Sequence, residues 1–80
     1  MTTAQVRKNI KLSNDFSGYM IRHINKFKHV VRNASIVVIP ENDKKLKEEN
    51  EKLLEKMKRR KHLYVATQLK DGWTVSKFKK

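Results

Sequence analysis

The last third of the chain carries the pattern that most constrains its fold. Residues 63–69 (LYVATQL) and 73–78 (WTVSKF) alternate apolar and polar side chains, and Lys70-Asp71-Gly72 separates them. Asp-Gly between two such segments is a strong signal for a β-hairpin, expected here over residues 62–80. We expect a three-residue loop with Gly72 in the left-handed conformation, whereas a two-residue loop would divide the apolar residues between both faces. The three-residue register puts one set on the core face: Leu63, Val65, Thr67, Leu69, Trp73 and Val75.

The first third of the chain predicts a strand followed by a helix. Residues 6–12 alternate imperfectly and favour a half-buried strand, after a flexible tail at residues 1–5. From Asp15 to Arg32 apolar residues recur at spacings of four and three, which predicts one amphipathic helix with Phe27 on its apolar face. The short polar side chains at residues 13–15 are suitable caps for that helix.

An apolar run in the middle of the chain predicts a buried strand. Residues 34–39 (ASIVVI) are mostly β-branched, and Pro40 ends the run. We expect this strand to be central in its sheet. With the preceding strand and helix it would form a right-handed βαβ crossover.

The charged segment that follows predicts a second helix at residues 42–61. Its acidic residues come early and its cations late, as the helix dipole favours. Its apolar stripe is thin, and Asn50 interrupts it. Either the helix is mostly solvated and lies across the sheet edge, or the stripe contacts a partner helix through Leu46, Leu53, Leu54 and Met57.

These elements predict a small single α+β domain with the order β-α-β-α-β-β. Two helices would pack on a mixed sheet that ends in the C-terminal hairpin. The 80 residues include no cysteine, so neither a disulfide nor a zinc-thiolate site can hold the fold together. The longest apolar run, residues 36–39, is far too short for a membrane span, and no signal-peptide core is present. We therefore expect a soluble, cytoplasmic protein.

The element order expected over residues 6–40 resembles the start of the ribosome hibernation factors. The stretches concerned are VRKNIKLS, DFSGYMIRHINKFKHVV and ASIVVIPE. The charged helix at residues 42–61 departs from that family, in which further strands would follow directly. No residue role is therefore carried over from the family to this chain.

Net charge is the strongest compositional indication of function, at +12. Residues 1–40 contain seven Lys or Arg and one acid, residues 41–55 contain four and six, and residues 56–80 contain nine and one. A chain that is basic at both ends favours polyanionic partners such as RNA, DNA, ribosomes or acidic protein surfaces. The simpler explanation is that a Lys-rich composition keeps a small protein soluble.

Residues 56–62 (KMKRRKH) concentrate five cations and a histidine. Cations at a helix C-terminus stabilise the helix by about 0.3–1 kcal/mol without any ligand, but one or two would suffice. If the last strand returns beside the helix end, this run and the basic C-terminal tail would form one phosphate-binding patch. The candidate nucleic-acid contacts are Lys56, Lys58, Arg59, Arg60, Lys61, His62, Lys77, Lys79 and Lys80, with Arg22 and Lys26 from the first helix.

Aromatic residues on the hairpin could add base stacking to this patch. In the three-residue register, Tyr64 and Phe78 oppose each other on the face away from the core, and Trp73 is the third candidate. Exposed aromatic residues beside cations hold unstacked bases in sheet-based RNA-binding proteins. The alternative is that all three belong to the core or are covered by the second helix.

Catalysis has little support in the sequence. The histidines are not spaced to share a helical face, so neither a metal site nor any other cofactor is expected, and no Gly-rich phosphate loop or nucleophile motif is present. One enzyme class is conceivable, a metal-independent ribonuclease of the toxin type. Its candidate residues would be Arg22, His23, His62, Tyr64 and Lys77.

The sequence thus favours a small non-enzymatic nucleic-acid-binding protein, with RNA or the ribosome ranked before DNA. A phage or mobile-element regulator would have this size and charge. The alternative is a protein-interaction or inhibitor module that docks through the second helix. The protein would be a homodimer if that helix pairs with itself and a monomer otherwise.

Overall fold

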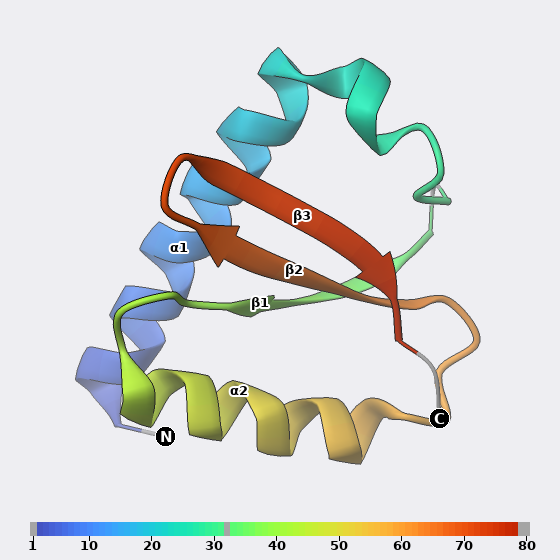
Figure 1. The fold of residues 1–80 in the computed structure, drawn as a ribbon. Coiled ribbons are helices and arrows are strands. Elements are labelled where there is room, and N and C mark those ends of the chain that lie inside the picture. The colour runs from blue at the N-terminus through green and yellow to red at the C-terminus, as the bar shows by residue number, and fades with distance from the viewer. Residues whose placement is uncertain (1, 32, 79–80) are drawn as a thin grey trace.

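The computed structural model describes residues 2–31 and 33–78 of the chain. The elements are α1 (Thr3–Arg22), the short 3₁₀ helix η1 (Ile24–Phe27), β1 (Ser35–Ile39), α2 (Lys44–Met57), β2 (Leu63–Leu69) and β3 (Gly72–Lys77) (Figure 1). The strands form one mixed sheet in the order β1-β2-β3, in which β1 is parallel and β3 antiparallel to β2. The α+β class, the two helices, the mixed sheet and the C-terminal hairpin are therefore confirmed.

The N-terminal segment is helical, so the strand predicted at residues 6–12 is wrong. The tail predicted at residues 1–5 is also wrong from Thr3 onward, because the helix begins there. Thr2 caps α1: its hydroxyl accepts a hydrogen bond from the Gln5 amide (3.2 Å), and the Gln5 side chain accepts one from the Thr2 amide (2.8 Å). This reciprocal capping box satisfies amides that a helix N-terminus otherwise leaves unpaired. Residues 13–15, expected to be the cap, lie inside the helix.

The first helix ends at Arg22, ten residues before its predicted end at Arg32, which lies outside the described residues. The chain turns at His23, whose amide donates to the carbonyls of Tyr19 and Met20. The short helix η1 then returns toward the sheet and buries Phe27, as predicted for that residue. The early turn brings the residues after η1 to the free edge of β3.

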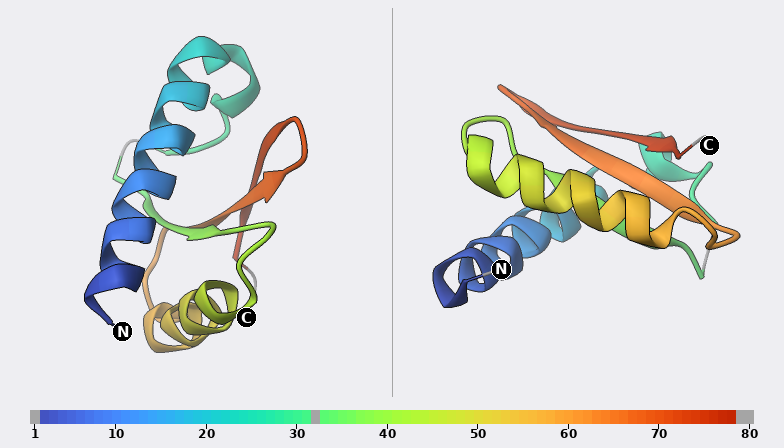
Figure 2. Two further views of the ribbon diagram at one scale, coloured as in Figure 1. Left: turned by 90° about the vertical axis from the view of Figure 1, so that its left-hand side faces the viewer. Right: turned by 90° about the horizontal axis from the view of Figure 1, so that it is seen from below.

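The strand predicted at residues 34–39 is confirmed as β1, but it lies at an edge of the sheet, and β2 is central. Because residues 6–12 are helical, the strand-helix-strand order expected over residues 6–40 is absent. The predicted crossover and the resemblance to ribosome hibernation factors therefore do not hold. The crossover that exists runs β1-α2-β2, and β1 is apolar on both faces because α1 and α2 pack on opposite sides of it (Figure 2).

The hairpin forms where predicted but with a two-residue loop. Leu69 pairs with Gly72, and no described residue has a positive φ, so the left-handed conformation expected for Gly72 is wrong. Gly72 is required for another reason: a Cβ there would lie 2.7 Å from the Tyr19 hydroxyl oxygen. Contacts that short are repulsive, so the glycine allows α1 and the hairpin to approach each other.

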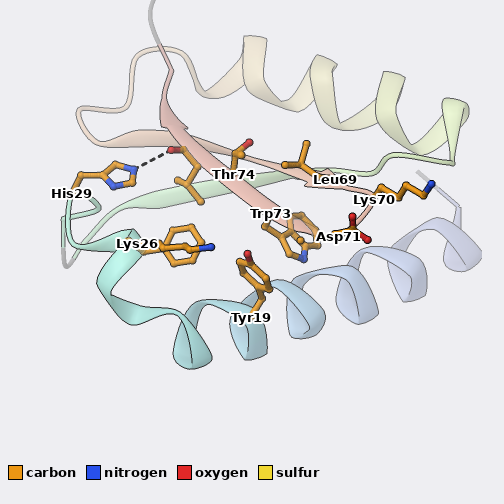
Figure 3. Close-up of a pocket in the computed structure, with 11 residues that line it drawn as sticks. Tyr19, Lys26, His29, Leu69, Lys70, Asp71, Trp73 and Thr74 are labelled. Atoms are coloured by element: carbon orange, nitrogen blue, oxygen red, sulfur yellow. Dashed lines mark hydrogen bonds between the residues drawn. The ribbon is translucent and has the colours of Figure 1, made fainter.

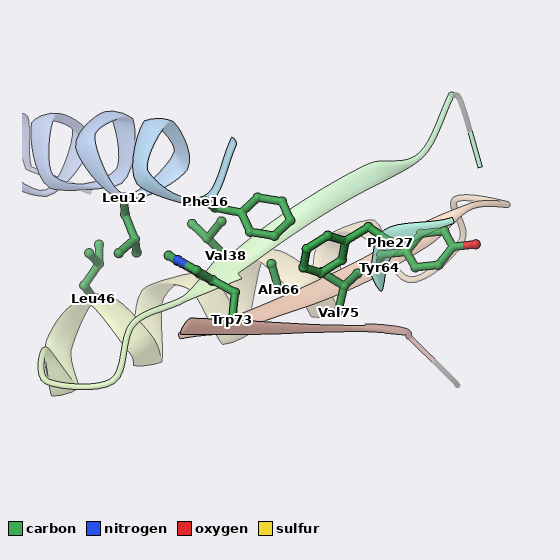
Figure 4. Packing of buried hydrophobic residues seen from close by; sticks show 9 residues of the cluster. All are labelled: Leu12, Phe16, Phe27, Val38, Leu46, Tyr64, Ala66, Trp73 and Val75. Atoms are coloured by element: carbon green, nitrogen blue, oxygen red, sulfur yellow. The ribbon is translucent and has the colours of Figure 1, made fainter. Parts of the chain in front are cut away.

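The two-residue register divides the apolar side chains of the hairpin between two core clusters. The larger cluster lies between the sheet, α1 and η1 (Figure 4) and contains Leu12, Phe16, Phe27, Val38, Leu46, Tyr64, Ala66, Trp73 and Val75. The smaller cluster lies on the opposite face against α2 and contains Val37, Ile39, Leu54 and Leu63. A shift of one residue in register exchanges the faces of every side chain in one strand relative to the other. The predicted single core strip is therefore wrong.

The second helix is shorter than the predicted residues 42–61. Asp43 is its N-cap, and the Asp43 carboxylate accepts hydrogen bonds from the Leu46 amide and from the Lys8 side chain of α1 (both 3.0 Å). These contacts, the Leu46 amide first, hold the pKa of Asp43 below its ordinary value. Neither α1 nor α2, nor any other helix within the described residues, is long and apolar enough to cross a membrane.

Candidate functional site

The cations of residues 56–61 surround the C-terminal end of α2. The helix ends at Met57, and the Arg60 amide donates to the Met57 carbonyl (2.9 Å), which closes a turn before β2 begins. The Phe78 amide donates to the Leu63 carbonyl (2.8 Å), so the end of β3 lies beside the start of β2. The end of α2 and the end of the hairpin therefore share one end of the molecule (Figure 1).

The predicted phosphate contacts on this turn are accessible. His62 is half-buried. The five cations of the run are all exposed: Lys56, Lys58, Arg59, Arg60 and Lys61. Lys58 forms an ion pair with Glu55 (3.6 Å), and Arg60 donates a long hydrogen bond to the Ser35 hydroxyl (3.4 Å). Within the described residues, the other four cations of the run, Lys56, Arg59, Arg60 and Lys61, make no ion pair. We name these five cations the α2-end cluster.

The structure separates the other predicted cations from this cluster. Lys77 is exposed at the same end of the sheet but on its other face. It pairs with Tyr64 and lies with it on the face that α1 covers, whereas α2 covers the opposite face. Arg22 and Lys26 lie near the hairpin turn, where they line hollows with Lys70 and Asp71. Lys79 and Lys80 are outside the described residues. Arg22 and Lys26, predicted as further nucleic-acid contacts, therefore lie apart from the α2-end cluster.

The predicted base-stacking aromatics are buried or half-buried in the fold. Tyr64 is buried and donates its hydroxyl hydrogen to the His29 carbonyl (3.1 Å). Trp73 is buried, and its ring meets the Phe16 ring edge-on at 5.2 Å. Phe78 is half-buried on the α2 face, opposite to Tyr64. The aromatic prediction is wrong because Tyr64 and Trp73 belong to the larger core cluster and Phe78 packs against the smaller one.

The apolar stripe of α2 is largely used inside the domain. Leu46 and Leu54 are buried, and Met57 packs against the smaller core cluster, whereas Leu53 remains exposed. The prediction that another protein docks through the whole stripe is therefore wrong, because most of the stripe is covered inside the domain. Asn50, which interrupts the apolar stripe, is 1% exposed. Its side-chain amide donates to the Val38 carbonyl and to the Asn9 side chain (both 2.8 Å).

The candidate ribonuclease residues do not form one site. Arg22 and His23 end α1 near the hairpin turn, whereas His62, Tyr64 and Lys77 lie at the other end of the hairpin. The His23 ring stacks on Tyr19 with a centroid distance of 4.2 Å. Among the described residues, no three His, Asp or Glu side chains are arranged to hold a metal ion.

One further region, the free edge of β3, has no local signal in the sequence. A groove of about 510 Å³ runs along it, between η1 and the hairpin (Figure 3). His29, which had no assigned role, lies there with its Nε2 atom 2.9 Å from the Val75 carbonyl oxygen. The groove depends on the turn after α1, which the periodicity of residues 15–32 did not indicate.

Comparison with known proteins assigns the chain to a family without assigning an activity. No curated protein and no solved structure matches it. The family match begins at residue 4 and ends at residue 75, so it extends from the first turn of α1 into β3. By this match, the chain belongs to a family of unknown function, DUF5647.

Proposed function

We propose that the protein binds nucleic acid in the cytoplasm through the α2-end cluster, without catalysing a reaction. The observation that carries the proposal is the exposure of five cations within six consecutive residues at one turn, four of which make no ion pair within the described residues. Arg side chains present forked donors that match phosphate oxygens, and Lys adds compact positive charge. Stabilising the end of α2 would need fewer cations than this.

The proposed ligand contact is the phosphate backbone and not the bases. Tyr64 and Trp73 are buried in the core, so they cannot stack on bases while the domain is folded. Phosphate contacts position a protein on nucleic acid but carry no sequence information. We therefore infer binding with little sequence preference and a strong dependence on salt, and we rank RNA or the ribosome before DNA.

The test compares two double variants that remove equal charge from the two ends of α2. Arg59→Gln with Lys61→Gln changes the α2-end cluster at two residues that make no ion pair within the described residues. Lys44→Gln with Lys47→Gln is the matched control, because both lysines are exposed and lie in the first turn of the same helix. Affinity for single-stranded RNA and for duplex DNA is measured at several salt concentrations.

With four to six phosphate contacts, the parent should show a slope of log K against log[salt] of about −3 to −5. The α2-end variant should reduce the magnitude of this slope by roughly 1.4–1.8, and the control variant should change it little. Equal effects of both variants would show diffuse attraction and contradict the assigned site. Absence of binding by the parent at low salt would overturn the proposed function.

A further inference from the structure

Successive residues of β3 direct their backbone amides and carbonyls alternately toward β2 and away from it. In an antiparallel pair, every second residue directs its amide and carbonyl to the neighbouring strand. The Phe78 amide donates to the Leu63 carbonyl, and the two-residue loop closes on the pair Leu69 and Gly72. These two pairs determine which residues of β3 face β2. Gly72, Thr74 and Ser76 therefore face β2, whereas Trp73, Val75 and Lys77 direct their amides and carbonyls away from the sheet.

This outward edge of β3 is covered by one side chain. Strand β3 is the last strand of the sheet, and within residues 2–31 and 33–78 no backbone group of another element pairs with its outward side. His29 reaches the edge from the segment after η1, with its Nε2 atom 2.9 Å from the Val75 carbonyl oxygen. Unpaired amides and carbonyls of an edge strand are a ready template for another strand.

The groove of about 510 Å³ gives such a strand a place to lie. Phe27, Trp73 and Val75 supply apolar lining, and Lys26, His29 and Lys70 stand along it (Figure 3). In added strands, backbone hydrogen bonds supply affinity, while pockets for alternate side chains supply specificity. The β3 edge combines both features.

The charges around the edge select among possible occupants. Lys26 and Lys70 line the groove, Lys77 ends β3, and all three are exposed; Asp71 is the acidic residue that lines the groove. A second copy of the chain would bring another net charge of +12 to this surface, which disfavours pairing of β3 with itself. Acidic side chains on an added strand would instead meet opposite charge.

We propose that β3 is a docking edge for an extended, acidic segment of a partner protein. The segment adds a fourth strand to the sheet, and its amide replaces His29 as the partner of the Val75 carbonyl. This interaction uses residues other than the α2-end cluster, so it does not rest on the proposed nucleic-acid binding.

The probe is a capped peptide of about eight residues that alternates Glu and Val, long enough to pair along the edge. Binding is followed by amide chemical shifts and hydrogen exchange of the protein. We expect hydrogen exchange of the Trp73, Val75 and Lys77 amides to slow by about tenfold or more when the peptide concentration is well above its dissociation constant. A peptide with Lys in place of Glu should not bind, and a Glu-Val peptide methylated on its strand-facing amides should bind at least about tenfold more weakly.

Two substitutions at Lys77 separate backbone pairing from charge. Lys77→Gln removes the charge and keeps the amide, whereas Lys77→Pro also removes the outward amide, at an edge position where proline costs no bond to β2. The proline variant should lose clearly more affinity than the glutamine variant, provided that its amide spectrum shows the parent fold. His29→Ala should bind about two- to tenfold more tightly, because the peptide no longer displaces the imidazole.

Several outcomes would overturn the docking proposal. Absence of peptide binding would do so, as would equal binding of the methylated peptide, which would reduce the interaction to charge attraction. A dimer in solution with β3 amides protected would make a second copy the occupant. Protection of the same amides by RNA instead of peptide would assign the edge to nucleic acid.

Discussion

The β1 edge and the β3 edge belong to one sheet of three strands, yet the chain covers them differently. At the β1 edge, the side chain of Asn50 is buried and bonds to the Val38 carbonyl and to Asn9, so that α1, α2 and the strand are tied together. At the β3 edge, the imidazole of His29 approaches the Val75 carbonyl from an exposed residue. A helix built into the fold closes the first edge, whereas one exposed side chain covers the second.

The difference shows that a small domain can close one edge of its sheet with a helix and leave the other edge open. Edge strands invite unwanted pairing, and proteins cover them with helices or surround them with charge. Here α2 covers β1, and lysines surround β3. The same helix carries the α2-end cluster, so closing one edge also presents the cations that we propose bind phosphates.

The largest expected effect concerns Phe27, which holds η1 and thereby the segment that carries His29. Its ring packs edge-on against Phe16 at 6.0 Å and against Tyr19 at 5.9 Å. Phe27→Ala should reduce the free energy of unfolding by about 3–5 kcal/mol, enough to unfold much of a small domain. Thermal melting measures this, with Ile24→Ala as the control, because Ile24 is 58% exposed in the same helix. Melting within a few degrees of the parent would contradict the core assignment.

A direct comparison of the two edges uses Asn50→Ala and His29→Ala. The first leaves the Val38 carbonyl without its donor in a buried place, so we expect a loss of about 2–3 kcal/mol of stability. The second leaves the Val75 carbonyl beside an open groove that water can enter, so the loss should stay below about 1 kcal/mol. Chemical denaturation measures both values. Equal losses would mean that the edges are closed to a similar degree.

The contact between α1 and the hairpin turn should give an intermediate effect. Gly72→Ala places a methyl group against the ring of Tyr19, which His23 and Phe27 hold in place, so we expect a loss of about 1–2 kcal/mol. The same substitution in a Tyr19→Ala background should cost little, because the obstructing ring is gone. A cost that is equal in both backgrounds would point to backbone conformation as the cause.

The smallest expected effect is the pH dependence of the Asp43 cap at the start of α2. The pKa of Asp43 is lower in the folded protein than its ordinary value of 3.8, so the charged form stabilises the fold. This contribution is present above the ordinary pKa and is lost as the pH falls through the lower, folded value. The melting temperatures of the parent and of Asp43→Asn, which can still cap the helix, should therefore converge below that value. A difference independent of pH would contradict the charge contribution.

Features with local signals could be predicted from the sequence, and features that depend on packing could not. The apolar run up to Pro40, the Asp71-Gly72 turn and the cations after Lys56 are local patterns, and each is found near its predicted place. The strand predicted from Val6 to Leu12 failed because Val6 and Ile10, four residues apart, also fit a helix. The capping pair Thr2 and Gln5 was the overlooked signal.

The candidate sites divide in the same way. The α2-end cluster follows from a run of charge in the sequence, whereas the expected exposure of Tyr64 opposite Phe78 depended on a hairpin register that was wrong by one residue. The β3 edge could not be predicted, because it depends on how η1 folds back and on which strand lies last in the sheet. Those are properties of the whole fold.

Amide hydrogen exchange of the free protein, resolved residue by residue, tests most directly whether the β3 edge is open. Thr74 and Ser76 direct their amides to β2, so these amides should exchange slowly. Trp73, Val75 and Lys77 direct theirs to the groove or to solvent, so their exchange should be faster and should alternate with that of their neighbours. Uniform protection along residues 73–77, without any added partner, would show that this edge is already closed and would contradict the account.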